Sequence, residues 1–136
     1  MADVTAHIRW TGEGLQFVAG VDGKPHIVLD GDGVTGVAPA ATLILALGAC
    51  TAADVVDITG KMRVGLGALD VAIEGDRAPE PPRRYTRILL RYRATGVAPE
   101  ERDKIRRALD LSHEKYCSVL HSLREDVEIG TELEFV

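Results

Sequence analysis

Apolar and polar positions alternate along the first thirty residues of this chain. Every second position of residues 3–10 is apolar, and these positions are Val4, Ala6, Ile8 and Trp10. That period is typical of a half-buried strand. The alternation returns in residues 15–19 and 26–29, and the Asp-Gly pair between them is a common hairpin turn. The pattern predicts an antiparallel meander of three strands.

The longest apolar stretch covers residues 33–63, with Cys50 near its middle. Residues 33–53 carry no formal charge, and their apolar side chains are too crowded for a one-sided surface helix. This predicts a long, buried central helix. Pro39 suits its first turn, where the missing N–H of proline costs nothing. A membrane span is disfavoured because only about ten residues form the compact apolar core, against about 20 for a span.

Alternation resumes after this helix and again at the end of the chain. Residues 69–74 and 85–94 predict two strands of a hairpin joined by a proline-rich link. Pro99 is followed by two glutamates and then by apolar residues at helical spacing, which predicts a second helix. Cys117 precedes a short further helix, and residues 127–135 predict a closing strand. The order indicates an α+β fold with antiparallel sheet, in a single domain of residues 1–136.

Composition and charge narrow the function. The 136 residues are 46% hydrophobic but only 4% aromatic, so the core is aliphatic. The net charge of −5 disfavours nucleic acid as a partner. We interpret the arginines of residues 83–93 as a solvated strand face. The N-terminus lacks the pattern of a signal peptide, so we expect a cytoplasmic protein that is not bound to a membrane. In that compartment its two cysteines are not expected to form a structural disulfide.

Cofactor and metal motifs are weak. The glycine-rich residues 31–36 lack the Lys-Ser/Thr of a phosphate loop, and we expect a turn there and no bound cofactor. His113, Cys117 and His121 would share one face of an unbroken helix, but a fourth zinc ligand is not visible and Cys117 starts a new helix. We therefore expect no metal. His113 and Glu114 are candidates for polarising the second thiol, and the alternative is that they are plain surface residues or polar residues with satisfied hydrogen bonds.

The two cysteines are the candidate reactive groups. They are 67 residues apart in the chain, so they can meet only in the fold. A thiolate is the reactive form, and a helix N-terminus or a nearby cation lowers the thiol pKa. Cys117 has the helix-start position, and Cys50 would need a cation from elsewhere. The alternative is that either cysteine is a small core residue.

Two segments around these cysteines carry a recognisable pattern. APAATLILALGACTAADVV has a proline eleven positions before Cys50 in an Ala/Leu/Gly-rich helix, and LSHEKYCSVLHSL contains Cys117. Both resemble the cysteine motifs of the OsmC/Ohr family of osmotically inducible and organic hydroperoxide resistance proteins. The order of elements agrees along nearly the whole chain. The resemblance implies an OsmC-like fold, with antiparallel sheets, a long buried central helix, a second helix and an intertwined homodimer.

The resemblance also implies a reaction. The family reduces organic hydroperoxides with a peroxidatic cysteine, matched by Cys50, and a resolving cysteine, matched by Cys117. The first forms a sulfenic acid and the second condenses with it to a disulfide. A dithiol such as a dihydrolipoyl protein then reduces the disulfide by exchange. The family uses no metal or organic cofactor, and its active sites lie at the subunit interface.

The chain departs from the family pattern near the proline. Members carry an acidic residue one or two places after it, where this chain has Ala40 and Ala41. Their partner arginine comes from the N-terminal strands, where only Arg9 and Lys24 are cations here. Lys61, Arg63 or a cation of the other subunit are candidate substitutes.

This departure keeps two other functions open. One is a binding protein without peroxidase activity that holds an apolar ligand near Leu43 and Leu47. The other is a redox sensor, whose thiols predict stoichiometric oxidation in place of turnover.

Overall fold

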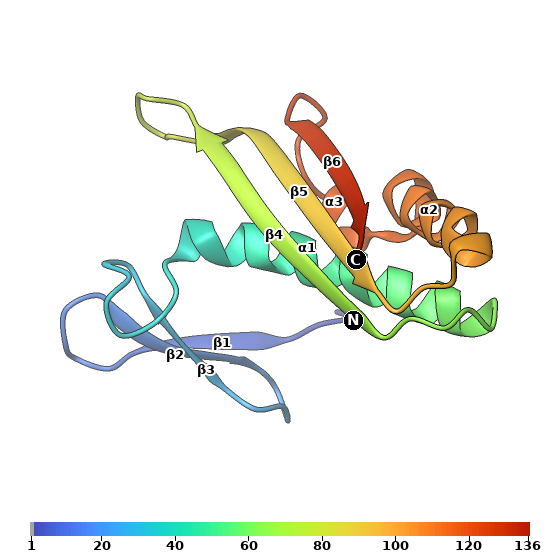
Figure 1. Cartoon of the computed structure of the whole chain (residues 1–136). Helices are drawn as coiled ribbons and strands as arrows, with labels where there is room; N and C mark the ends of the chain where they lie inside the picture. The colour runs from blue at the N-terminus through green and yellow to red at the C-terminus, as the bar shows by residue number, and fades with distance from the viewer. Residues whose placement is uncertain (1) are drawn as a thin grey trace. The chain divides into compact units, whose positions relative to one another are not determined.

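The computed structural model describes residues 2–136 and divides the chain into two compact units, residues 1–43 and 44–136. The first unit holds β1, β2, β3 and the start of α1, and the second holds the rest. In chain order the strands and helices are β1 (Ala6–Trp10), β2 (Gln16–Val21), β3 (Ile27–Asp30), α1 (Pro39–Lys61), β4 (Ala68–Arg77), β5 (Tyr85–Thr95), a 3-10 turn (Pro99–Glu101), α2 (Arg102–Leu111), a π-helical turn (Ser112–Tyr116), α3 (Ser118–His121) and β6 (Glu128–Phe135). Figure 1 shows them along the chain.

The first unit is the predicted antiparallel meander, with strand order β1-β2-β3. Ile8 faces Ala19, which faces Ile27, so the apolar side chains of all three strands share one face. This confirms the alternation seen in the sequence. The face is only thinly covered, because Ile8 is 62% and Trp10 58% exposed.

Asp30 organises the loop between β3 and α1. Its carboxylate accepts hydrogen bonds from the backbone N–H of Asp32 at 2.8 Å and from the backbone N–H and hydroxyl of Thr35 at 3.0 and 2.8 Å. These bonds, led by that of the Thr35 N–H, hold the pKa of Asp30 below its ordinary value. The glycine-rich segment is thus a turn held by a carboxylate, as expected.

α1 begins at Pro39, as predicted, and buries one stripe of its surface. The buried positions recur at helical spacing and are Leu47, Gly48, Thr51, Val55 and Thr59. By length and composition this helix could cross a membrane, but its stripe packs into the core of the second unit. Leu45 and Val56 are more than half exposed, so the prediction of burial all round is wrong for these two residues. Apolar composition alone does not reveal which face has a neighbour within one chain.

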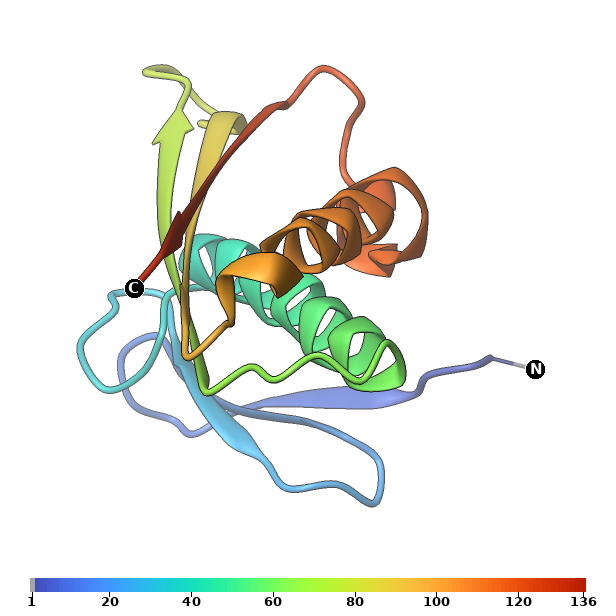
Figure 2. The same ribbon diagram turned by 45° about the vertical axis from the view of Figure 1, so that its right-hand side comes forward.

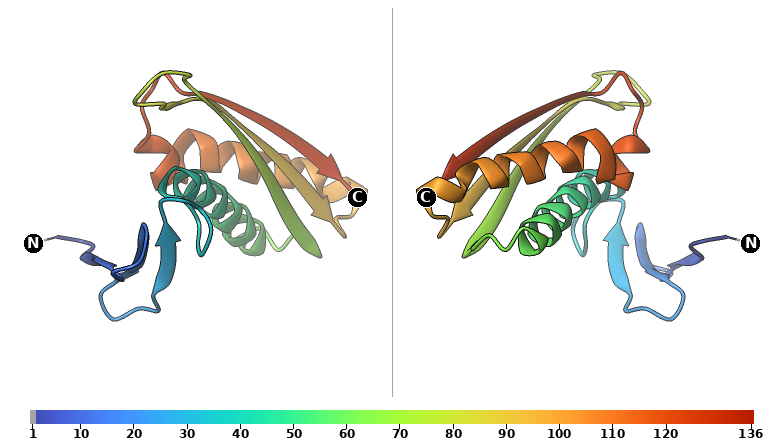
Figure 3. Two further views of the ribbon diagram at one scale, coloured as in Figure 1. Left: turned by 90° about the vertical axis from the view of Figure 1, so that its left-hand side faces the viewer. Right: turned by 90° about the vertical axis from the view of Figure 1, so that its right-hand side faces the viewer.

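The second unit is a layer of strands with helices on one side, as Figures 2 and 3 show. Its core joins Leu47 and Val55 of α1, Ile88 and Leu90 of β5, and Leu109 of α2. A Cβ at Gly48 would meet the tip of the Ile73 side chain of β4, which would have to move to make room for it. Gly48 therefore lies where α1 contacts the sheet.

The strand order of this sheet is β4-β5-β6. β4 and β5 form the predicted antiparallel hairpin, but β6 runs parallel to β5. The expectation of wholly antiparallel sheets is therefore wrong for β6. The physical reason is the long helical connection from β5 through α2 and α3, which brings the chain back in the same direction.

The outer face of β5 is charged, and its arginines are paired. Arg91 bonds Glu74 of β4 and Glu132 of β6, and Arg93 lies 3.5 Å from Glu134. These partly exposed ion pairs confirm the prediction of a solvated strand face. Exposed pairs of this kind contribute at most about 1 kcal/mol each.

Candidate dithiol site

The second unit brings Cys50 and Cys117 together. Cys50 lies in the middle of α1 and is partly buried, whereas Cys117 is fully buried directly before α3. The two sulfur atoms and a carboxylate oxygen of Asp54 all lie within 4.8 Å of one another. The structure thus places two thiols and one carboxylate at a single point.

Neutral hydrogen-bond donors surround the two sulfurs. The backbone N–H of Val119 donates to Cys50, and the Ser118 Oγ lies 3.9 Å from the Cys50 Sγ. The backbone N–H of Leu120 donates to the Cys117 Sγ at 3.3 Å. Cys117 is the N-cap of α3, so the start of this short helix supplies these donors.

The surroundings shift the pKa values of the two thiols in opposite directions. Burial acts to raise the pKa of Cys50, and the charge of Asp54 acts in the same direction. Hydrogen bonds from the Val119 N–H, the Cys117 thiol and the Ser118 hydroxyl outweigh both effects. The pKa of Cys50 therefore lies below its ordinary value. Burial raises the pKa of Cys117 to about 11.

This arrangement corrects two expectations about the thiols. The helix start was expected to lower the pKa of Cys117, but burial outweighs the bond from Leu120 there. Cys50 was expected to need a cation, yet the groups that lower its pKa are hydrogen-bond donors. Lys61 is instead paired with Asp57 at 2.9 Å.

Asp54 is held in place by a residue from the π-helical turn. The hydroxyl of the fully buried Ser112 donates to the Asp54 Oδ2 at 2.8 Å. This bond joins α1 to the segment that leads into Cys117. Sequence reasoning missed Asp54 as a site residue. The available signal was its position four residues after Cys50, which places both side chains on one face of the helix.

Tyr92 of β5 joins the same two segments. Its buried hydroxyl donates to the Thr51 Oγ1 at 2.8 Å and lies 3.1 Å from the His113 Nε2. Thr51 directly follows Cys50. The candidate His113 is thus part of the support of α1, and burial lowers its pKa. The other candidate, Glu114, is exposed to solvent.

His113, Cys117 and His121 do not lie on one unbroken helix. The π-helical turn ends at Tyr116, and the backbone of the following Cys117 is extended with ψ of 101°. The three side chains therefore lose the common face that a continuous helix would give them. This agrees with the predicted start of a new helix at Cys117.

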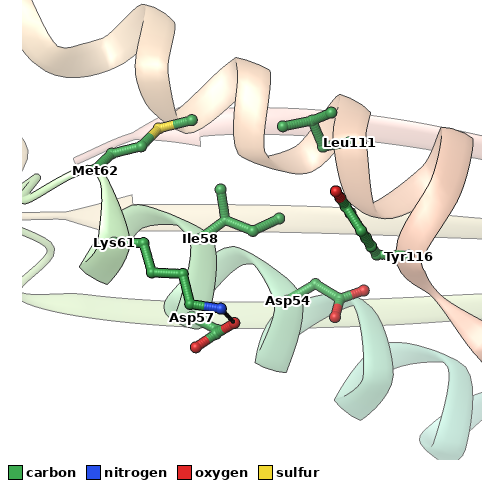
Figure 4. Close-up of a pocket in the computed structure, with 7 residues that line it drawn as sticks. All are labelled: Asp54, Asp57, Ile58, Lys61, Met62, Leu111 and Tyr116. Atoms are coloured by element: carbon green, nitrogen blue, oxygen red, sulfur yellow. Dashed lines mark hydrogen bonds and ion pairs between the residues drawn. The ribbon is translucent and has the colours of Figure 1, made fainter.

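A cavity of about 480 Å³ lies beside Asp54 (Figure 4). Figure 4 shows Asp54, the ion pair of Asp57 with Lys61, and Tyr116 around it. The lining residues are Asp54, Asp57, Ile58, Lys61, Met62, Leu111 and Tyr116. The lining is mixed, with apolar side chains from α1 and α2 and charged ones from α1.

Fold and site together define an α+β protein with a paired dithiol between its central helix and a later helix start. The family model described as OsmC-like protein matches residues 30–132. Protein YhfA of Escherichia coli K12 is 36% identical over 132 residues, covering 96% of this chain and 97% of the relative. The chain therefore belongs to the OsmC-like protein family.

Solved structures share the fold. A hypothetical protein from Aquifex aeolicus VF5 has a TM-score of 0.86 at 25% identity, covering 100% of this chain and 98% of the other. An organic hydroperoxide resistance protein OsmC from Legionella pneumophila has a TM-score of 0.68 at 15% identity, covering 98% of each chain. The α+β, OsmC-like fold predicted from the sequence is thereby confirmed.

Proposed function

We propose that this protein is a two-cysteine thiol peroxidase that reduces organic hydroperoxides. The observation that carries the proposal is the approach of the two sulfurs of Cys50 and Cys117 to within 4.8 Å. Membership of a family that includes hydroperoxide resistance proteins supports the substrate class. Cys50 is the nucleophile, because it is the more accessible thiol and carries the larger set of hydrogen-bond donors.

The reaction has three steps. The Cys50 thiolate attacks the terminal peroxide oxygen, the O–O bond breaks, and the departing alkoxide takes a proton to become an alcohol. Cys50 is then a sulfenic acid. The Cys117 sulfur attacks it, a disulfide forms, and the Cys117 proton leaves with the hydroxyl group as water. A dithiol such as a dihydrolipoyl group reduces the disulfide and becomes oxidised itself.

The hydrogen-bond donors around Cys50 replace the family's arginine in stabilising the thiolate. The bonds from Val119 and Ser118 stabilise the thiolate, although Ala40 and Ala41 stand where members carry an acid. A neutral donor holds a peroxide less firmly than a guanidinium does, since Arg offers five donors and a permanent charge. We therefore expect weaker peroxide binding than in members with the arginine.

The experiment is peroxide consumption by the reduced protein with dihydrolipoamide as reductant. We expect turnover that Cys50→Ser abolishes and that Cys117→Ser reduces to a single oxidation of Cys50. Mass spectrometry should find a Cys50–Cys117 disulfide after one equivalent of peroxide. The proposal would be refuted if the wild-type protein consumed no peroxide and both of its thiols stayed reduced.

We also propose a cytoplasmic homodimer in which each chain is one OsmC-like domain. The family model spans the boundary between the two units, which supports a single domain. Leu45 and Val56 are 51% and 55% exposed, lie eleven residues apart and so share one face of α1. Covering them stabilises by about 25 cal/mol per Å² of apolar surface. Leu45→Glu should convert a dimer into a monomer in size-exclusion chromatography, and Asp57→Asn should leave it a dimer.

Ligand binding without turnover is the second candidate, and the cavity favours it. A volume of about 480 Å³ lies within the range of small-molecule sites. Its apolar side is formed by Ile58, Met62 and Leu111, whereas Leu47, which was expected near the ligand, is fully buried in the core. A redox sensor would differ from both by consuming one equivalent of peroxide per chain. The turnover assay separates all three.

A further inference from the structure

Asp54 lies beside the two thiols, but none of the proposed peroxidase steps uses its carboxylate. Its carboxylate oxygen lies within 4.8 Å of both sulfurs, so a thiolate at either position faces a second negative charge. A site built only for a reactive thiolate gains nothing from that charge. Two thiols and a carboxylate within 4.8 Å are instead groups that a divalent cation brings together.

The positions in the chain have the arrangement of a zinc site. Cys50 and Asp54 are four residues apart on α1, so one face of the helix presents both. The third group, Cys117, comes from a distant segment. Ligands four residues apart on a helix recur in zinc proteins, and three protein ligands leave the fourth position open.

The two sulfurs and the carboxylate are also held in place by a second set of bonds. Ser112 donates to Asp54 at 2.8 Å, and the backbone N–H of Leu120 donates to Cys117 at 3.3 Å. Outer bonds of this kind orient metal ligands and contribute 10- to 100-fold to metal affinity. With Zn–S bonds of about 2.3 Å, tetrahedral geometry sets two sulfurs about 3.8 Å apart. The two sulfurs therefore need to close by about 1 Å or less.

We propose that Cys50, Asp54 and Cys117 bind Zn²⁺. Two thiolates favour this soft cation over Mg²⁺ or Ca²⁺, which take oxygen ligands. Asp54 also lines the cavity of about 480 Å³, so a water molecule from that side completes the tetrahedron. The inference goes beyond the peroxidase and does not depend on it. Binding displaces the thiol protons, so affinity rises with pH.

The test is titration of the fully reduced full-length protein with Zn²⁺ against a chromophoric chelator, and with Co²⁺ as a spectroscopic probe. We expect one ion per chain and an intense thiolate-to-cobalt charge-transfer band. Asp54→Asn should weaken Zn²⁺ binding at least tenfold, while its amide oxygen can still accept the Ser112 bond and preserve the fold. Ser112→Ala should weaken binding 10- to 100-fold.

The matched control is Asp103→Asn on α2, whose side chain is 96% exposed and paired with Arg106, and it should leave the Zn²⁺ dissociation constant unchanged. An Asp54→Asn dissociation constant within twofold of wild type would refute the three-ligand site. So would binding by the wild-type protein no stronger than that of the Cys50→Ser/Cys117→Ser variant. Metal binding is measured without peroxide, so zinc binding without turnover overturns only the peroxidase proposal, and turnover without zinc binding overturns only this inference.

Discussion

Replacing Tyr92 by Phe tests how the two cysteine segments are held together. The substitution removes one hydroxyl and leaves the ring, so no apolar volume is lost. The hydroxyl proton goes to Thr51, whose own proton goes to the Gly48 carbonyl at 3.1 Å. Since Tyr92 has only one proton, the His113 Nε2 donates to the Tyr92 oxygen. The variant therefore loses two hydrogen bonds.

The size of the effect follows from burial. Tyr92 is 1% exposed and Thr51 fully buried, so water cannot replace the lost bonds at no cost. Each hydrogen bond contributes about 0.5–1.5 kcal/mol net, which gives about 1–3 kcal/mol for both. A loss of about 2 kcal/mol lowers the Tm of a domain of this size by roughly 6–10 °C.

Thermal unfolding of the reduced protein, followed by circular dichroism, measures this loss. Tyr116→Phe is the matched control, because Tyr116 is 51% exposed, and we expect its Tm within about 2 °C of wild type. Disulfide formation after one equivalent of peroxide should also slow in Tyr92→Phe, because Thr51 and His113 flank the two cysteine segments. A Tm equal to that of wild type would refute the reasoning that this hydroxyl joins α1, β5 and the π-helical turn.

Three further predictions test the core, the second thiol and the titrating groups. Leu90→Ala should cost about 2–5 kcal/mol in urea unfolding, because Leu90 is fully buried, and a cost below about 1 kcal/mol would contradict the core assignment. Cys117→Ser should let the Cys50 sulfenic acid accumulate for trapping by dimedone, whereas a wild-type yield of trapped product would exclude Cys117 as the resolving thiol. The metal-free protein should lose stability as pH rises, since the folded pKa values of about 11 for Cys117 and about 12 for Tyr92 exceed the ordinary values of 9.0 and 10.0. The contribution of these two groups to the free energy of unfolding is fully present below pH 9 and lost by about pH 12. The Tyr92→Phe variant should therefore lose less stability than wild type between pH 10 and 12.

Much of the fold could be predicted because local periodicity specifies local structure. The alternation around Ile8 and Ile88 identified the strands and their faces, and Pro39 located the start of α1. The direction of β6 could not be predicted, because Ile129 alternates in the same way in a parallel or an antiparallel neighbour of β5. Strand direction depends on the path of the connection, which no local pattern contains.

The candidate site likewise contains features that the local sequence reveals and features that depend on tertiary packing. Cys50 and Cys117 were identified from their segments, and the helix start at Cys117 was predicted correctly. The donors to Cys50 come from Ser118 and Val119, far along the chain, so no spacing around Cys50 could reveal them. The sequence places Asp54 on the same helix face as Cys50, but the approach of Asp54 to Cys117 depends on how the later segment packs.

Two tasks meet at the sulfur atom of Cys117. Its Sγ accepts the Leu120 N–H that begins α3, and the same atom must bond to Cys50 when the disulfide forms. The two sulfurs lie within 4.8 Å and a disulfide bond is about 2.05 Å long, so disulfide formation must draw them together and acts directly on the cap of α3. Amide hydrogen exchange at Leu120, compared between the reduced and the oxidised protein, measures this coupling. Ser118 and His121 of this helix are exposed, so a change in the cap extends from the buried sulfur to the protein surface.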